Sequence, residues 1–381
     1  MSILKCRKSL ISIILTLTIC FTQTTYSAVR NKELPLRYAK NFKIVDLYTH
    51  RIATVIVDST STAEAIQHQY ALVPKGKPTP PLPKDITVIR TPVEDVAALE
   101  TIYIGFLETL NQLDSIIGVA TADYVVNSTI RKRIEEGTIQ KIQAVRPFNP
   151  ERLLILKPDL VFTSIPSEPT LNLQAKLARA GLPVVMTAEY KEYHPLARAE
   201  WIKFIAAFFD VSEQANTIFD EIVTQYEALL QKVDNVESRP NVFCGAPYSG
   251  VWHMASGDSY VAQLIHDAGG NYLWSHVRGS NAVPLDIERV FLKAANADVW
   301  LNPSFYKTRR TLIAADPRFK KFRAVQTGHI YNNTRQKIDS IGNPIWENGI
   351  VSPHDVLADL IKIFYPDQML DWDFVYYEKL R

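Results

Sequence analysis

Few residues of this sequence have the types and spacing of a reactive site. Gly257-Asp258-Ser259 supplies a hydroxyl, and His354-Asp355 supplies an imidazole and a carboxylate. These are the three groups of nucleophilic hydrolysis, and together they would cleave an ester if the fold brought them into contact. A structural interpretation is also open. The segment from Tyr260 to Asp267 is a predicted helix, and a serine just before it can cap its N-terminus.

The segment around Ser259 is similar to the nucleophile segment of one family of esterases, but two features of that family are missing. Those enzymes carry the serine near the mature N-terminus, and their Asp stands two residues before a late His. Here Ser259 lies far along the chain, and Asp355 follows His354. We therefore keep an exported esterase using Ser259 only as the alternative from a different functional class.

Other motifs of catalysis are absent from the sequence. It contains no G-x-x-x-x-G-K-[ST], no G-x-G-x-x-G and no H-E-x-x-H. The eight histidines lack metal-ligand spacing, and His253, His266 and His276 are too far apart to share one helix face. We therefore expect no enzyme, no catalytic residue, no metal site and no cofactor.

Aromatic residues beside polar ones are a stronger indication of a site. The chain has 17 Tyr and 6 Trp, and five of these lie between residues 248 and 274. Aromatic walls with a few polar groups suit a large, partly apolar ligand, although each ring could instead pack in the core. The predicted ligand-binding residues are Tyr103, Tyr124, Tyr248, Trp252 and Trp274, with Trp252 and Tyr248 as the first candidates.

One long helix is the clearest element that the sequence predicts. Between residues 212 and 235, apolar residues recur at three- and four-residue spacing, and no Gly or Pro intervenes. Ser212 can cap its start, and Glu213 suits the positive first turn. Short apolar strands alternate with helices on both sides of it, which indicates mainly parallel sheets.

A weak internal repeat suggests two lobes. In residues 151–162 and again in 288–301, a helix that opens with Glu-Arg is followed by an Asp and a short apolar strand. The expected fold class is therefore α/β, with two Rossmann-like lobes joined by a single long helix. One larger α/β domain is the alternative. Ligands of such sheets bind beyond the carboxyl ends of the strands. The candidate cleft loops are 100–103, 121–124, 164–168, 189–194, 247–257, 272–280, 302–306 and 333–346.

The first residues have the pattern of a signal peptide. Three basic residues precede an apolar run from Leu10 to Phe21 that is too short to span a membrane comfortably, and Thr25-Tyr26-Ser27 offers small residues for cleavage after Ser27. Cys20 ends a loose lipobox in which Ile19 replaces the usual small residue, so a lipid anchor at Cys20 is the alternative. Both interpretations predict an exported, periplasmic protein.

The expected organisation has five segments. They are a signal peptide (1–27), an N-terminal extension with a β-hairpin (28–84), an N-terminal lobe (85–211), the bridging helix (212–235) and a C-terminal lobe (236–381). The extension contains alternating runs at 42–47 and 52–57, but too little apolar sequence for a core of its own.

Cysteine content and charge exclude two further features. After the signal segment the chain retains only Cys244, in a predicted strand, so we expect a buried core residue and no disulfide. The formal net charge is +2 and the basic residues are scattered, which argues against a nucleic-acid partner. We expect a monomer.

From about Ile86 to Pro366 the sequence resembles the class III periplasmic substrate-binding proteins, which serve iron-siderophore and cobalamin ABC importers. The matching segments are VIRTPVEDVAALETIYIGFLETLNQLDSIIGVA, NPERLLILKPDLVF, LARAGLPVVM and LDIERVFLKAANADVWL. The resemblance implies that the protein captures an iron-siderophore between two lobes and delivers it to an inner-membrane ABC permease. Cobalamin is the second expected ligand, and haem the third.

The resemblance also implies two docking residues. In the family, one Glu on each lobe meets Arg residues of the permease, and the matching positions here are Glu151 and Glu288. The alternative is that each carboxylate only stabilises the first turn of its helix through the macrodipole. Glu100 departs from the family, because many relatives have Ser or Thr at this position, so the ligand cannot be carried over from them.

Overall fold

The computed structural model describes residues 31–57, 65–142, 151–165, 177–279, 281–336 and 341–381. The predicted signal peptide and the lipid anchor at Cys20 lie outside these residues. So do parts of the predicted cleft loops 164–168, 272–280 and 333–346. In the described part of the chain, no helix is long and apolar enough to cross a bilayer.

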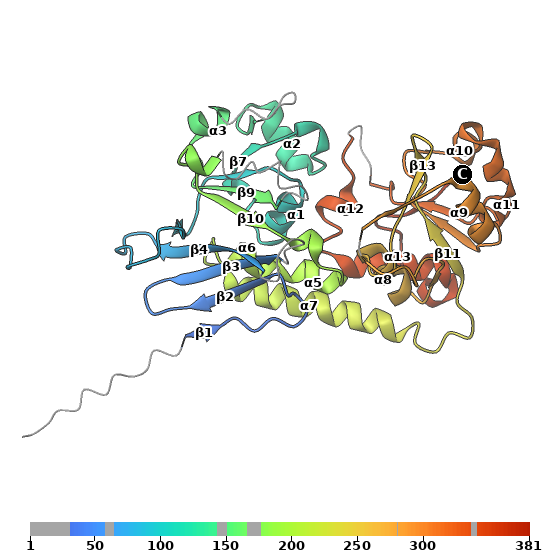
Figure 1. The fold of residues 1–381 in the computed structure, drawn as a ribbon, viewed down its shortest axis with the longest axis horizontal. Coiled ribbons are helices and arrows are strands. Elements are labelled where there is room, and N and C mark those ends of the chain that lie inside the picture. Colours follow the sequence, from blue (N-terminus) through green and yellow to red (C-terminus); the bar gives the residue numbers. More distant parts are fainter. Residues whose placement is uncertain (1–30, 58–64, 143–150, 166–176, 280, 337–340) are drawn as a thin grey trace, which may run out of the picture. The chain divides into compact units, whose positions relative to one another are not determined.

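The N-terminal extension supplies four strands of a five-stranded sheet in the order β1-β2-β3-β4-β5 (Figure 1), and β5, which lies beyond residue 84, pairs parallel with β4. The predicted hairpin is confirmed, because β2 pairs antiparallel with β3. This sheet packs against the core formed by later residues of the chain, since the ring of Phe42 lies 4.8 Å from Trp201 and 5.5 Å from Phe204. The strands are β1 Lys32–Glu33, β2 Phe42–Asp46, β3 Arg51–Val57, β4 Ile66–Pro74 and β5 Thr87–Thr91.

A second sheet follows, with all neighbours parallel, in the order β10-β9-β6-β7-β8. Its strands are β6 Val96–Ala98, β7 Ile116–Val119, β8 Gln140–Lys141, β9 Leu160–Ser164 and β10 Val184–Thr187. The helices of this part are α1 Ile102–Thr109, α2 Ser128–Glu135, α3 Glu151–Leu156, α5 Pro195–Glu200 and α6 Ile202–Ala206.

The remaining residues form a third large sheet in the order β14-β11-β16-β17-β18, parallel except for β18, and a small antiparallel sheet β12-β13-β15. The strands are β11 Asn241–Cys244, β12 Pro247–Tyr248, β13 Val251–Met254, β14 Asn271–Tyr272, β15 Val283–Leu285, β16 Val299–Leu301, β17 Ile330–Asn332 and β18 Glu378–Lys379. The helices are α8 Tyr260–Asp267, α9 Ile287–Ala294, α10 Arg309–Ala315, α11 Arg323–Thr327, α12 Pro344–Glu347 and α13 Pro353–Phe364. The α/β class with mainly parallel sheets is thus confirmed.

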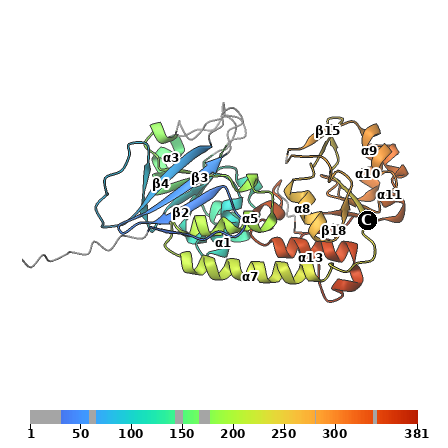
Figure 2. The same ribbon diagram turned by 60° about the horizontal axis from the view of Figure 1, so that its bottom comes forward.

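The predicted long helix is α7, Ser212–Gln231, of 20 residues. It ends four residues earlier than predicted. Val211 occupies its N-cap position, so the prediction that Ser212 caps it is wrong. α7 contacts α5, α6 and α13, and Figure 2 shows α13 beside it. That this helix alone joins two lobes, and where the lobes begin and end, stays a prediction.

An aromatic cluster forms the core next to β11 and β16. The ring of Trp300 lies 4.9 Å from Phe243, 5.6 Å from Trp252 and 5.3 Å from Phe322. The indole N–H of Trp252 donates to the Cys244 carbonyl at 2.9 Å. Cys244 itself is buried, as predicted.

The prediction that Trp252 walls a cleft is therefore wrong. We expected a loop at 247–257, but the chain forms the hairpin β12-β13 there. Side chains alternate along β13, so Trp252 and Met254 point into the core while Val251 and His253 point outward. A large apolar ring on the inner face of a strand is removed from water and from any ligand.

Trp252→Ala should lower the free energy of unfolding by about 3–5 kcal/mol, because it empties the centre of the aromatic cluster. Tyr248→Ala is the matched control, since Tyr248 is 69% exposed on the neighbouring strand. Its effect should stay within about 0.5 kcal/mol. Urea denaturation followed by circular dichroism measures both. Equal unfolding midpoints for the two variants would contradict the packing described here.

Candidate functional site

Two adjoining pockets lie beyond the carboxyl ends of the parallel strands. The first has a volume of about 220 Å³ and follows β6 and β7. The second has a volume of about 420 Å³ and follows β11, β16 and β17. Thr101 and Tyr124 line both pockets, so the two meet at these side chains.

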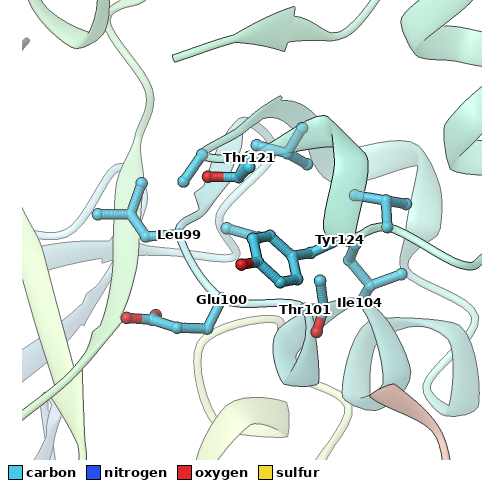
Figure 3. A pocket seen from close by; sticks show the side chains of 10 residues that line it. Leu99, Glu100, Thr101, Ile104, Thr121 and Tyr124 are labelled. Carbon is cyan, nitrogen blue, oxygen red and sulfur yellow. The ribbon is translucent and has the colours of Figure 1, made fainter. Parts of the chain in front are cut away.

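The first pocket is built where β6 and β7 end. These strands are parallel neighbours, so the residues after them, Glu100 and Thr101 from one and Thr121 from the other, emerge at the same edge of the sheet. Figure 3 shows the ring of Tyr124 among these side chains. In that view the oxygens of Tyr124, Thr121 and Glu100 all lie toward the same side of the pocket.

Glu100 is the acidic group of this pocket. Its carboxylate accepts hydrogen bonds from the Thr163 hydroxyl and from the Ser164 amide, both at 3.2 Å. Burial raises the pKa of Glu100 to about 8, and the neighbouring carboxyl of Glu189 acts in the same direction. The ionisable neighbour that shifts the pKa of Glu100 is thus a second acid and not a base.

A buried polar layer lies behind Glu100. Burial raises the pKa of Glu189, and the guanidinium of Arg198 partly opposes this. The Thr187 hydroxyl bonds to the carboxylate of Glu189 and lies 2.9 Å from the hydroxyl of Tyr103. The ring of Tyr103 stacks on Phe162 at 5.2 Å and is fully buried. Tyr103 therefore supports the pocket from behind, and the prediction that it contacts a ligand is wrong in this conformation.

The second pocket combines exposed apolar side chains with amides. Tyr124, Phe305, Ile341 and Trp346 are all partly or largely exposed, Phe305 by 78%. The polar lining consists of amides and hydroxyls, from Asn302, Ser304, Asn332, Asn333, Thr334 and Asn343.

The loop after β16 is held in an uncommon conformation. Asn302 and Ser304 have φ angles of 54° and 62°, in the left-handed region that non-glycine residues rarely adopt. The side-chain amide of Asn332 donates to the Ser304 carbonyl at 2.8 Å and stabilises this turn. Such strain persists only where the surrounding structure determines it, and it is often found at binding sites. Phe305, which follows this turn, is exposed.

Helix α12 carries Trp346 to the second pocket. The carboxylate of Glu347 accepts the amides of Val126 and Asn127 at 2.9 and 2.7 Å. A Cβ on Gly105 would lie 1.9 Å from the Glu347 carbonyl, so this close approach of α1 and α12 requires glycine. Burial raises the pKa of Glu347 to about 7.

The aromatic predictions have mixed outcomes. Tyr124 lies between both pockets as a ligand-binding residue should. Trp274 is buried under Lys293, whose Nζ lies 5.2 Å from the ring centre, and Tyr248 is exposed on β12. Neither of them is among the described residues that line the two pockets.

Phe305 and Trp346 line the second pocket, but they are not among the ligand-binding residues that the sequence predicts. Both lie in predicted cleft loops, 302–306 and 333–346. Their position in loops that follow strands, with asparagines in the same loops, was the available signal. Ser259 has a structural role, because its hydroxyl accepts the Ala262 amide at 3.2 Å and caps α8 as the structural interpretation predicts.

The raised pKa values predict that stability falls as pH rises. Burial favours the neutral forms of Glu347 and Glu100 in the folded state. Their contribution to the free energy of unfolding is therefore fully present below the ordinary pKa of 4.5. It is lost as the pH rises through about 7 for Glu347 and about 8 for Glu100. Glu100→Gln should remove the part of this pH dependence that extends to about pH 8, as measured by urea denaturation between pH 4.5 and about 8. Glu221→Gln, an exposed change on α7, should keep it. Identical pH profiles for the two variants would contradict the assignment.

Comparison with known proteins places the chain in a family. Residues 96–336 match the family model of the periplasmic binding proteins. An uncharacterized lipoprotein of Methanocaldococcus jannaschii is 24% identical over 374 residues, which cover 90% of this chain and 85% of the relative.

Solved structures share the fold. A periplasmic binding protein from Veillonella parvula is similar with a TM-score of 0.60 and 14% identity, covering 82% of this chain and 98% of its own. A possible iron-binding, periplasmic solute-binding protein from Staphylococcus epidermidis has a TM-score of 0.55 and 19% identity, covering 72% of this chain and all of its own. The chain thus belongs to the periplasmic binding protein family, as its resemblance to the class III members predicts.

Proposed function

We propose that this protein is the substrate-binding component of an ABC importer. It captures an iron-siderophore or a similar metal chelate in the two adjoining pockets and delivers it to an inner-membrane permease. The observation that carries the proposal is Tyr124, a half-exposed ring shared by two pockets at the carboxyl ends of parallel strands. Membership of the periplasmic binding protein family supports it.

The chemistry of the walls fits a bulky ligand. Phe305, Trp346 and Tyr124 leave large apolar surfaces in contact with water, and a ligand that covers them gains about 25 cal/mol per Å² buried. Asparagine side chains offer both donors and acceptors between these rings. Cobalamin and haem are the alternative ligands of the same class.

An exported esterase using Ser259 is the alternative from another class. It is disfavoured, because the Ser259 side chain is buried and its oxygen is engaged as a helix cap. The proposal therefore predicts that purified protein will not turn over a chromogenic ester. Turnover that is lost in Ser259→Ala would favour the esterase.

Trp346→Ala should weaken binding about tenfold or more, since stacking and burial of one ring contribute roughly 1–3 kcal/mol. Intrinsic fluorescence titration with an iron trihydroxamate, cobalamin and haem measures the affinity. Tyr248→Ala is the matched control, an exposed aromatic that lies outside the described lining of both pockets. Equal losses in both variants, or no change in Trp346→Ala, would argue against this site.

The proposal includes a docking surface on α3 and α9. Glu151 and Glu288 stand in the first turns of these helices, and both are exposed. Four residues later, on the same helix face, each is followed by an exposed apolar side chain, Ile155 at 81% and Leu292 at 85%. The macrodipole accounts for a first-turn carboxylate, but it does not account for exposed isoleucine and leucine at matching positions.

Glu288 already has a cationic neighbour. Its carboxylate lies 2.7 Å from a guanidinium nitrogen of Arg318, which also pairs with Asp316. Exposed ion pairs of this kind contribute about 0–1 kcal/mol. A permease arginine could therefore replace or share Arg318 at little cost.

Combining Glu151→Lys with Glu288→Lys should abolish ligand-dependent stimulation of the reconstituted importer's ATPase, because reversed charges repel the permease arginines. Ligand affinity of the isolated protein should stay within about twofold, since both residues lie outside the described pocket linings. The control combines Glu135→Lys with Glu221→Lys, which makes the same charge change on the exposed faces of α2 and α7.

Two outcomes would count against this docking surface. Normal stimulation by the Glu151 and Glu288 double variant would show that the permease does not use these residues. Loss of ligand binding in the same variant would show that they stabilise the protein instead.

A further inference from the structure

The described lining of the two pockets contains an acidic residue but no basic one. Among the described residues that line the two pockets, Glu100 is the one acid, and none is Lys, Arg or His. The rest are amides, hydroxyls, aromatic rings and aliphatic side chains. Among these described residues, Glu100 is thus the one ionisable group other than tyrosine, and the charge it can carry is negative.

Arg198, the cation that acts on the neighbouring Glu189, is engaged by other groups. Arg198 is half-buried and donates to the carbonyls of Glu192 and Tyr190 at 2.9 and 2.7 Å, and its guanidinium lies 4.4 Å from the ring centre of Tyr260. The acids on which it acts are Glu189 and Glu192. Glu100 instead receives two neutral donors, from Thr163 and Ser164.

A carboxylate in this position is costly to ionise without a partner. Burial disfavours its charge, and the buried Glu189 and Tyr103 behind it supply no positive charge. A cation delivered by the ligand would pair with Glu100 inside a partly dehydrated pocket, where the attraction is stronger than in water. An anion placed there would gain no such pairing and would disfavour ionisation of Glu100 further.

We infer that the cleft selects a chelate that presents an ammonium-type cation to Glu100 and discriminates against polyanionic chelates. This inference rests on the proposed function, because it names the charge class of ligand for the same cleft. An uncharged iron trihydroxamate core carrying a free amine has this chemistry. Tris-catecholate iron chelates and haem carry negative charges, which the described pocket lining has no basic residue to neutralise.

A matched pair of ligands tests the inference. The probes are an iron trihydroxamate with a free terminal ammonium and the same chelate with that amine acetylated, titrated by calorimetry. The wild-type protein should bind the ammonium form about tenfold or more tightly than the acetylated form. In Glu100→Gln the preference should disappear, whereas Glu135→Gln, an exposed change on α2, should retain it.

Each outcome separates the inference from the function on which it rests. Equal wild-type affinity for the two forms, a preference that survives in Glu100→Gln and Glu100→Ser, or tight wild-type binding of a polyanionic tris-catecholate chelate would overturn the inference and leave the proposed function intact. If the wild-type protein binds none of these chelates, nor cobalamin or haem, the proposed function fails. Thermal unfolding of each variant confirms that the titrated protein is folded.

Discussion

Buried carboxylates that accept backbone N–H groups tie distant segments of this chain together. The Glu200 carboxylate accepts the amides of residues 37–39, and that of Asp359 accepts the amides of 375–377. Glu347 does the same for residues 126 and 127. In each case the acid supplies an acceptor that an irregular segment lacks, and buried amides must be paired. The terminal segments and α12 depend on these bonds for their positions.

Glu100 follows the same rule but differs in its surroundings. It accepts the amide of Ser164, as the structural acids accept theirs, yet it also lines a pocket. An acid with only protein neighbours fixes the chain, whereas an acid at a pocket can also meet a ligand. The contrast between Glu347 and Glu100 therefore separates a structural carboxylate from a candidate binding group.

The parallel sheets explain why one site can be so large. Neighbouring strands such as β6 and β7, or β16 and β17, end at the same edge, so the loops that follow them collect there. The positions of Thr121 and Phe305 follow from this geometry. Local hydrogen bonds then complete the site, because Asn332 holds the loop before Phe305 and Glu347 holds the helix that carries Trp346.

The sequence by itself determined the α/β alternation, the helix α7 and most of the loops that line the pockets, because these depend on local periodicity and on strand direction. Among the aromatic residues that it selected, Tyr124 lies in the lining of both pockets. Only the tertiary structure decided that Trp252 and Tyr103 are buried while Phe305 and Trp346 are exposed. The local sequence around an aromatic residue does not distinguish a place in the core from a place in a cleft. Its burial depends on segments far away in the chain. The absence of a basic partner for Glu100 in the described pocket linings is likewise a tertiary property, since it depends on which cations the fold places elsewhere.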